Sequence, residues 1–336
     1  MRRYWIRLAG LGALLLGLSN LSALAETHAL LIGVSSYPKL PPQFRLQGPR
    51  NDVQSMQRAL SALGVPSRNI SVLADGLTHP ATRQSIFQLF DSARAKMRPG
   101  DWLILYLSGH GSQQPQLGKG NGYQESDGLD EIFLPYDIGK WDGRVGKVEN
   151  AILDDEFGEF IGALNAQGVS VWAIFDTCHA GNMAKGLSAP DVDAKYRYIS
   201  PSTLEIPRQL MMRSNAQNVS PKKSSKSTNQ TALQVNFYAS APDEQTPEEL
   251  LASLTSANGR PTMHQGLFTW HLAKLLPSWQ GSFVELAQQI SAAYRAEQRP
   301  FPSPTFEGDL GVTPSFLFNP DKPALSASTF QTNRQR

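Results

Sequence analysis

Short, continuous runs of apolar residues recur along the first half of the chain, and turn-forming residues bound each run. They lie at residues 28–34 (HALLIGV), 70–73, 102–107 (WLILYL) and 169–175. A run of this length without polar alternation is typical of a strand that is buried on both faces of a parallel sheet. We therefore predict four buried strands in this half of the chain.

Helical periodicity fills the intervals between these strands. Four apolar residues share one face of the segment 52–63, which ends at Gly64, and similar patterns predict helices at about 80–97 and 155–166. Strands that alternate with helices imply right-handed crossover connections. The pattern predicts the α/β class, with a largely parallel central sheet flanked by helices on both faces.

The pattern changes in the second half of the chain. Residues 214–231 contain almost no apolar side chains, so this segment cannot bury enough surface to offset the entropy that is lost on ordering. We interpret it as a mobile linker. The other elements predicted here are a strand at 235–239, helices at 266–276 and 282–294, and a polar tail at 319–336.

The first 25 residues have the pattern of a secretory signal peptide. Three arginines within the first seven residues precede an apolar segment at 8–18, and the tripeptide Ala-Leu-Ala comes before Glu26. We therefore predict cleavage before Glu26, export to the periplasm or the extracellular medium, and no stable membrane association. An uncleaved anchor is the alternative, because the apolar stretch with its flanks approaches the length of a spanning helix, although Ser19 and Asn20 interrupt it.

Composition narrows the functions that remain. The 336 residues are 40% hydrophobic and 18% charged, which is an ordinary globular composition, and 31 basic against 29 acidic residues give a net charge of +2. So small a net charge provides no bulk attraction to a polyanion, and we expect no nucleic-acid partner. Cys178 is the only cysteine, so it cannot form an intramolecular disulfide and acts as a thiol.

Two polar motifs follow two of the predicted strands. The strand at 102–107 runs into SGHGS, which contains His110, and the strand at 169–175 runs into DTCHAG, which contains Cys178. Functional groups gather at the carboxyl ends of parallel strands, so we expect these two residues on one rim of the sheet if the strands are neighbours. An imidazole beside a thiol raises the thiolate fraction or accepts the proton during attack, so the pair fits a nucleophile and its base.

Backbone amides and a carboxylate extend this chemistry. The glycines that flank His110 let a substrate approach closely, and the N–H groups of Gly111 and Cys178 could form an oxyanion hole. Asp176 lies two residues before Cys178, so on an extended segment it points the same way and would attract Arg or Lys. Two structural alternatives stay open, with Cys178 as a small buried apolar residue and His110 as a turn residue between glycines.

The two motifs together resemble those of the metacaspases, the caspase-like cysteine peptidases of bacteria, plants, fungi and protists. The resemblance extends to LLIGVSSY, to LQGPRND at residues 46–52, and to VNFYASAPDEQ and HQGLFTWHL in the C-terminal part. It implies a caspase-like fold with a large-subunit-like region at 26–190, a flexible insertion at 191–232 and a small-subunit-like region at 233–318. It also implies a monomer.

The resemblance implies roles for individual residues. His110 corresponds to the general base and Cys178 to the nucleophile. The acidic residues and the serine of the family's primary specificity pocket correspond to Asp52, Ser108 and Asp176. Caspases that cleave after Asp carry Gln where Asp176 stands, so the expected activity is endopeptidase cleavage of peptides or proteins after Arg or Lys.

Two features of this pocket stay open. Pro49 stands where the family pattern often has Cys, so the pocket wall can differ. Asp52 is also a suitable N-cap for the helix that is predicted to begin there.

Calcium is the one cofactor that the resemblance suggests, although the peptidase chemistry requires none. Many metacaspases bind calcium near a pair of aspartates that Asp154 and Asp155 resemble, and Asp127 or Glu125 would add a hard oxygen ligand. The chain reads NMAK at residues 182–185, where the family can place a further Asp, so calcium dependence is open. Asp154 and Asp155 could instead stabilise a helix N-terminus, and Asp127 could lie in a solvated loop.

The insertion is rich in basic residues, which an enzyme of this specificity could cleave in its own chain. Self-processing is therefore a second open expectation, although flexible Lys/Ser segments are common without it. The basic residues in or near the insertion are Lys195, Arg197, Arg208, Arg213, Lys222, Lys223 and Lys226.

Two further classes of function compete with the peptidase. One is an inactive peptide-binding scaffold on a peptidase fold. The other is a metal site built from His110, Asp176, Cys178 and His179, although adjacent Cys and His lack the usual ligand spacing.

Overall fold

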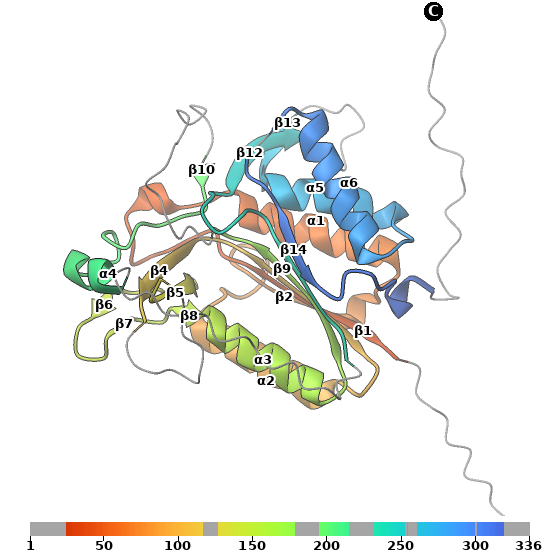
Figure 1. The fold of residues 1–336 in the computed structure, drawn as a ribbon, viewed down its shortest axis with the longest axis horizontal. Helices are drawn as coiled ribbons and strands as arrows, with labels where there is room; N and C mark the ends of the chain where they lie inside the picture. Colours follow the sequence, from red (N-terminus) through yellow and green to blue (C-terminus); the bar gives the residue numbers. More distant parts are fainter. Residues whose placement is uncertain are drawn as a thin grey trace, which may run out of the picture.

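A six-stranded sheet forms the centre of the protein, which we describe from a computed structural model (Figure 1). The structure describes residues 25–116, 127–178, 195–214, 232–252, 254, 261–299 and 301–318. The strand order is β14-β11-β9-β3-β1-β2, with every neighbouring pair parallel except β11 and β14. The prediction of an α/β fold with a largely parallel central sheet is confirmed. The strands of this sheet are β1 (Thr27–Gly33), β2 (Ile70–Ala74), β3 (Trp102–Ser108), β9 (Ser170–Asp176), β11 (Gln234–Tyr238) and β14 (Thr305–Gly308).

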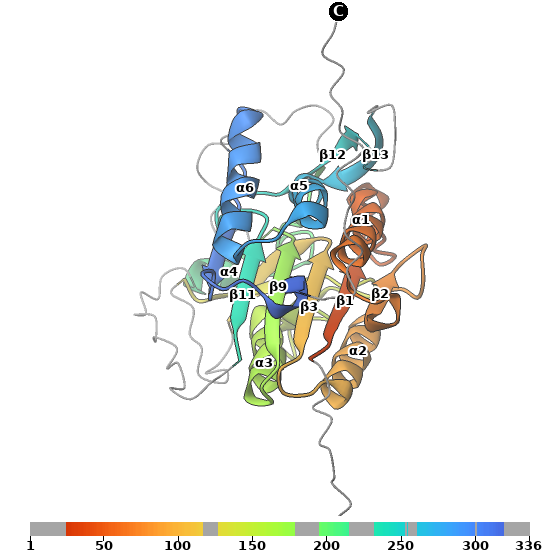
Figure 2. The ribbon, with the colours of Figure 1, turned by 90° about the vertical axis from the view of Figure 1, so that its right-hand side faces the viewer.

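Helices cover both faces of the sheet, as expected (Figure 2). Alternate residues of the central strands face opposite layers: Leu103, Leu105 and Leu107 pack with α2 and α3, whereas Trp102 and Ile104 pack with α1, α5 and α6. Because both faces are buried, these strands appear in the sequence as unbroken apolar runs. The helices are α1 (Gly48–Leu63), α2 (Arg83–Lys96), α3 (Asp154–Ala166), α4 (Arg208–Ser214), α5 (Leu267–Leu275) and α6 (Phe283–Ala296).

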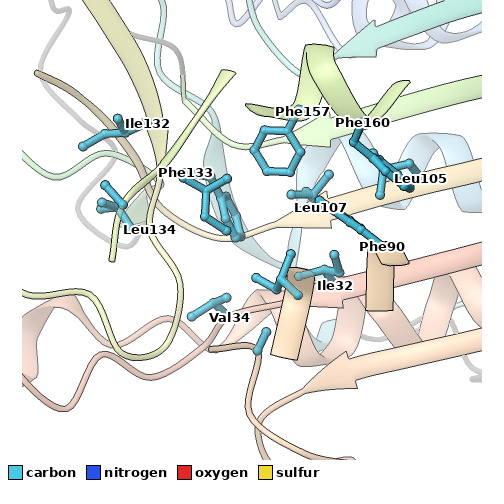
Figure 3. Close-up of a cluster of buried hydrophobic side chains, with 14 of the residues drawn as sticks. Ile32, Val34, Phe90, Leu105, Leu107, Ile132, Phe133, Leu134, Phe157 and Phe160 are labelled. Atoms are coloured by element: carbon cyan, nitrogen blue, oxygen red, sulfur yellow. The ribbon is translucent and has the colours of Figure 1, made fainter. Parts of the chain in front are cut away.

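An aromatic cluster ties α2 and α3 to the sheet (Figure 3). Phe90 of α2 stacks on Phe160 of α3 with 4.1 Å between ring centroids, and Phe157 meets Phe133 edge-on at 6.3 Å. Full burial of side chains of this kind contributes about 2–3 kcal/mol each relative to leaving them exposed. The cluster therefore holds the helical layer firmly beneath the strand ends that carry the polar motifs.

The start of α1 differs from the prediction. The helix begins at Gly48, with Pro49 in its first turn and Gln47 as its N-cap, rather than at Asp52. Pro is well suited to a first helical turn, because the amide that it lacks has no intrahelical partner there. Asp52 is consequently inside the helix and fully buried, and the alternative that it serves as an N-cap is wrong.

Three small sheets were not predicted, because their strands are short and alternate only weakly in hydrophobicity. They contain the order β4-β5-β8, the order β10-β12-β13, and the pair β6-β7. Their strands are β4 (Gly111–Pro115), β5 (Leu129–Phe133), β6 (Trp141–Asp142), β7 (Lys147–Val148), β8 (Ile152–Leu153), β10 (Lys195–Tyr196), β12 (Pro247–Ala252) and β13 (Pro261–Gly266).

Part of the predicted flexible insertion is packed against the domain. Residues 195–214 include Arg197, Ile199 and Leu204, all fully buried. Apolar side chains at these positions explain why this stretch orders, so the expectation of a flexible insertion from residue 191 does not hold for residues 195–214. Residues 215–231 of the predicted linker at 214–231 and the polar tail at 319–336 lie outside the described residues, as do residues 1–24 of the predicted signal peptide.

Within the described part of the chain, no helix is both long and apolar enough to cross a membrane.

Candidate active site

The two polar motifs lie side by side at one end of the sheet. Strands β3 and β9 are direct parallel neighbours, and Ser108 at the end of β3 is level with Asp176 at the end of β9. His110 and Cys178 each follow two residues later. The expectation that both motifs leave the same rim is therefore confirmed.

Cys178 is buried and is held by Thr246. The Thr246 amide donates a hydrogen bond to Cys178 Sγ at 2.9 Å, and Sγ lies 3.7 Å from the Thr246 carbonyl oxygen as a weak donor. Burial raises the pKa of the Cys178 thiol to about 12, against an opposing effect of the Thr246 backbone. In this arrangement the sulfur is a neutral thiol at physiological pH.

His110 is buried beside Tyr37 and Phe44. Its amide donates to the Tyr37 hydroxyl at 2.7 Å, and its Nε2 lies 2.8 Å from the Phe44 carbonyl oxygen. Burial lowers the pKa of His110 to about 4, although contacts with the backbone of Phe44 and Arg197 oppose the shift. The imidazole is therefore uncharged near neutral pH, the state in which it can accept a proton.

The three predicted pocket residues converge on one side chain, Arg197. Its Nη2 lies 2.5 Å from Asp52 Oδ2, and its Nη1 lies 2.9 Å from both Asp176 Oδ1 and Ser108 Oγ. Ser108 in turn donates to Asp52 at 2.9 Å. The structure therefore brings Asp52, Ser108 and Asp176 together, and a guanidinium group fills the space between them.

Two glycines leave the space that the Arg197 guanidinium occupies. A Cβ atom on Gly48 would lie 2.6 Å from Arg197 Nη2, and one on Gly266 would lie 2.7 Å from Nη1. Glu248 is fully buried nearby and accepts hydrogen bonds from the amides of Gln47 and Gly48 at 2.9 and 2.8 Å. Glycine at both walls leaves room for a planar, bidentate cation.

Other backbone and hydroxyl groups fix the two pocket aspartates. The Gly266 amide donates to Asp52 Oδ1 at 2.9 Å, and the Thr269 amide and hydroxyl both donate to Asp176 Oδ2. Burial opposes the charge on Arg197, but Asp176, Asp52 and Glu248 more than offset it, so the pKa of Arg197 lies well above its usual value. The guanidinium is therefore charged.

The backbone of Arg197 is held as firmly as its side chain. The Arg197 amide donates to the Thr246 carbonyl at 2.9 Å, and the Gly111 amide donates to the Arg197 carbonyl at 3.0 Å. Two residues earlier, Lys195 pairs with Glu248 in the antiparallel ladder between β10 and β12. The predicted oxyanion-hole amide of Gly111 thus contacts a peptide carbonyl of the chain itself.

Sequence reasoning missed several residues of this site. The sequence places Arg197 among the basic residues of a predicted flexible insertion, and Glu248 and Gly266 lie on the hairpin β12–β13, which the sequence does not predict. Thr246 directly follows the motif VNFYASAPDEQ, which carried the resemblance but no assigned role. Only the apolar side chain of Ile199 could have signalled that the stretch around Arg197 is buried.

The predicted calcium ligands do not make a metal site among the described residues. Asp154 and Asp155 lie in the first turn of α3, whose N-cap is Leu153, and Asp154 and Asp127 line a cavity of about 840 Å³ that reaches Cys178. The described part of the chain contains no group of three His, Cys, Asp or Glu side chains placed to hold a metal ion. Glu125 and residues 179–194 lie outside the described residues, so calcium dependence stays a prediction.

The metal-site alternative has no support in the described residues. Asp176 uses its carboxylate on Arg197 and Thr269, and Cys178 has Thr246 as its partner. His179 lies outside the described residues.

Comparison with known proteins decides the family of the region that carries both motifs. Residues 27–186 match the model of the family described as metacaspase, peptidase C14 domain. This region of the chain is therefore similar to the peptidase domain of the metacaspases. Metacaspases are cysteine-type peptidases, and the assignment confirms the resemblance that the motifs indicated. Arg197 lies beyond the matched region.

Curated relatives agree with this assignment. Metacaspase-1 of Candida albicans is 31% identical over 183 residues, which cover 53% of this chain and 37% of the relative. Metacaspase-1A of Aspergillus oryzae is 32% identical over 158 residues, covering 46% and 34%. The chain thus spans about a third of the length of the curated relatives it matches.

A solved structure supports the fold over most of the chain. The crystal structure of protein GSU0716 from Geobacter sulfurreducens superposes with a TM-score of 0.56 and 20% identity, covering 87% of this chain and 96% of that one. At this identity, the likeness concerns the fold alone.

Proposed function

We propose that this protein is a cysteine endopeptidase that cleaves peptide bonds after Arg or Lys. Cys178 is the nucleophile, His110 is the general base, and the amides of Gly111 and Cys178 form the oxyanion hole. One observation supports the proposed specificity. The guanidinium of Arg197 lies between Asp52, Ser108 and Asp176, at the carboxyl ends of the strands that lead into the two motifs.

The catalytic steps follow from this placement. A substrate Arg enters the pocket and places its carbonyl oxygen on the Gly111 amide, where developing negative charge is stabilised. His110 accepts the thiol proton while Cys178 Sγ attacks the carbonyl carbon, and it returns the proton to the leaving amine. Water then hydrolyses the thioester, which releases the carboxylate and restores the thiol.

The thiol must turn before it can attack. Among the described residues its hydrogen-bond partner is Thr246, and His110 Nε2 faces the Phe44 carbonyl. Catalytic hydrogen bonds are often loose until substrate binds, so this geometry is compatible with a resting site.

Charge explains why the pocket favours basic residues. Asp52, Asp176 and Glu248 are all fully buried, so an acidic substrate side chain would meet uncompensated negative charge in a region of low dielectric. Arg suits the site better than Lys, because its planar fork can contact two carboxylates and a hydroxyl at once.

We further propose that the protein acts on exported peptides or proteins as a monomer, after removal of a signal peptide at residues 1–25. Support comes from the sequence pattern of this segment. Calcium is proposed only as a modulator, because the dyad supplies both the nucleophile and the base.

Hydrolysis of matched fluorogenic peptides that end in Arg, Lys or Asp tests this proposal. Three proteins are assayed in parallel: the 26–336 chain, its Cys178→Ala variant and its Arg197→Lys variant. Each is assayed after prolonged incubation, once with calcium and once with a chelator. We expect cleavage after Arg and Lys that is absent from the alanine variant. Cleavage only after Asp would contradict the assigned pocket.

The inactive scaffold is a second candidate, because Arg197 fills the pocket that a substrate would need. If the protein is an inactive scaffold, no Arg197 variant hydrolyses the peptides that end in Arg, Lys or Asp. Hydrolysis by any of them excludes it.

A further inference from the structure

A second cavity lies beside the specificity pocket. Its volume is about 660 Å³, and its wall combines the start of α1 with the segments that follow β1 and β2. Gln47 links it to the specificity pocket, because Gln47 lines the cavity and its amide donates to the pocket residue Glu248 at 2.9 Å. The catalytic steps proposed above make no use of this cavity.

Basic side chains outnumber acidic ones among the described residues of the cavity wall. Arg45, Arg50 and Lys195 line it, against the single carboxylate of Asp75, which accepts a hydrogen bond from the Ser35 amide at 2.8 Å. None of the three basic side chains forms an ion pair with a carboxylate of the described residues. The excess positive charge makes an anionic group the complementary ligand.

The two arginines are placed to meet such a group. The Arg50 amide donates to Ser35 Oγ at 3.2 Å, and a Cβ atom on Gly76 would lie 3.2 Å from Arg50 Nη1, so this guanidinium rests on the backbone of the cavity wall. Arg45 and Arg50 both have exposed side chains, which can turn toward a ligand. A guanidinium matches a carboxylate through two parallel hydrogen bonds.

Strand β10 relates the cavity to the specificity pocket. Lys195 pairs with Glu248 in the antiparallel ladder between β10 and β12, and Arg197 follows two residues later. Side chains two apart on an extended chain point the same way. Accordingly, Arg197 enters the specificity pocket, while Lys195 lines the cavity and its Nζ donates to the Arg45 carbonyl at 3.1 Å.

A substrate Arg that binds in the specificity pocket takes the place of the Arg197 side chain. If the substrate follows the same edge of β12, its residue two positions earlier takes the place of Lys195 beside Arg45 and Arg50. Addition of a strand to an open sheet edge is a common way in which extended peptides are bound.

We propose that this cavity is a second specificity subsite, which selects substrates with Glu or Asp two positions before the basic residue of the cleaved bond, and that Arg45 and Arg50 bind this carboxylate. The inference rests on the proposed peptidase function and adds a preference at a second position of the substrate.

The opposite charges of the two sites also fix the register of the substrate. The specificity pocket is acidic and deeply buried, whereas the cavity is basic and partly open. A peptide that reads Glu-X-Arg satisfies both, and a peptide bound in the reverse direction places like charges together, which is unfavourable. Lys195 itself adds a third positive charge to the cavity, and a backbone carbonyl holds its ammonium group.

The subsite is tested by hydrolysis of matched fluorogenic peptides that end in Arg and carry Glu, Gln or Lys two positions earlier. We expect kcat/KM for the Glu peptide to exceed that for the Gln peptide by about threefold to tenfold at low salt, the range for exposed ion pairs. The Lys peptide should be the poorest of the three. The difference should lie in KM rather than kcat, and about 0.5 M salt should reduce it.

Two controls locate the effect. The double variant Arg45→Gln/Arg50→Gln should bring the ratio of the Glu peptide to the Gln peptide close to unity. Arg58→Gln, at an exposed arginine of α1 that does not line the cavity, should keep the wild-type ratio. Peptides that carry Glu or Gln directly before the terminal Arg should be hydrolysed equally well, because this position faces away from the cavity.

Equal kcat/KM for the Glu and Gln peptides would overturn the subsite while leaving the peptidase intact. So would a Glu preference that persists in the double variant, or one that is the same at both positions of the peptide. No hydrolysis of any Arg peptide, by the wild type or by Arg197→Lys, would instead overturn the proposed function, so the two failures are distinguishable.

Discussion

Cys178 and His110 are both buried, and burial moves their pKa values in opposite directions. The thiol pKa rises to about 12 and the imidazole pKa falls to about 4, so both groups are neutral near pH 7. Two neutral groups form no ion pair that a substrate would have to break. The neutral thiol is, however, a weak nucleophile. The two residues of the proposed dyad are therefore both uncharged near pH 7 in this structure.

The first prediction concerns the reactivity of this thiol. Iodoacetamide should alkylate Cys178 in the intact, native chain at least roughly a hundredfold more slowly than in the unfolded chain at pH 8, because only the thiolate reacts. Cys178 is the only cysteine, so the mass gain reports this site alone. Equal rates in the two states would contradict its burial.

The second prediction concerns stability against pH. The folded-state pKa of His110 lies below its ordinary value of 6.5, so the unfolded chain binds this proton more tightly. His110 should thus lower the free energy of unfolding as the pH falls from about 6.5 to 4, by on the order of 3 kcal/mol.

Urea unfolding at several pH values, compared between wild type and His110→Gln, isolates this contribution. The comparison is needed because burial raises the pKa of Asp130 to about 6, and this carboxyl acts in the opposite direction over the same range. Parallel curves for the two proteins would refute the prediction.

The third prediction concerns specificity. Asp176→Asn removes one of the two carboxylates that contact the guanidinium, so the ratio of kcat/KM for an Arg peptide over an Ala peptide should fall about a hundredfold to a thousandfold. The ratio cancels any change in the fraction of open sites. Asp91→Asn, at an exposed aspartate of α2, should leave it unchanged.

Residue chemistry was predictable where it followed buried strands. His110, Ser108, Asp176 and Cys178 come directly after apolar runs, and the rule for the ends of parallel strands places them together. Arg197 was not predictable, because an arginine beside a polar insertion gives no sign that its side chain is buried against two carboxylates.

At the scale of elements, glycines shape the pocket where the hairpin β12–β13 meets α1. A Cβ atom on Gly266 would lie 2.2 Å from Asp176 Oδ2 and 2.7 Å from Arg197 Nη1. These contacts are too short for any rotation of the aspartate alone to relieve both.

The fourth prediction follows from this crowding. Gly266→Ala should destabilise the fold by about 2 kcal/mol, a typical cost of overpacking, and should also lower Arg-peptide hydrolysis. Gly162→Ala is the matched control, because a Cβ there meets no atom within 4 Å and the residue lies inside α3. That change should stabilise the fold by about 0.5–1 kcal/mol, since alanine favours the helix. Thermal unfolding of both variants checks the two signs.

The elements themselves were predicted unevenly, for physical reasons. Strands β1, β3 and β9 are buried on both faces and appear as apolar runs. Helix α6 begins at Phe283, and Ser282, the first residue of the predicted helix, is its N-cap and forms a capping box with Glu285. The hairpin β12–β13 was not predicted, because it lies outside the main sheet. The sequence of β12, PEELLA, also contains charged residues, which a partly exposed strand can carry. This hairpin provides the edge on which Lys195 and Arg197 lie.

For the whole molecule, the parts of the chain before and after residues 215–231 contribute to one core. Trp172 of β9 packs against Phe237, Trp279 and Phe283 from the C-terminal part, with ring centroids 5.1–5.5 Å apart. β11 also pairs with β9 along its whole length. The two parts share too much buried apolar surface to separate readily.

The fifth prediction is that the protein remains one particle after its chain is cut within the predicted linker, at Lys222, Lys223 or Lys226. Gel filtration after complete cleavage should give a single peak at the volume of the uncut Cys178→Ala chain, with both fragments in it. Denaturant should be needed to separate them. Dissociation in buffer would show that the shared core does not hold the products together.

The central claim is that Cys178 is a nucleophile that faces a pocket for basic side chains. The most direct test is covalent labelling of the protein with two peptidyl chloromethyl ketones that differ only in Arg or Asp at the terminal residue, followed by intact-mass analysis. We expect a single adduct on Cys178 with the Arg reagent, suppressed by excess Arg peptide, and little or none with the Asp reagent. An adduct with the Asp reagent alone, or equal labelling by both, would contradict it.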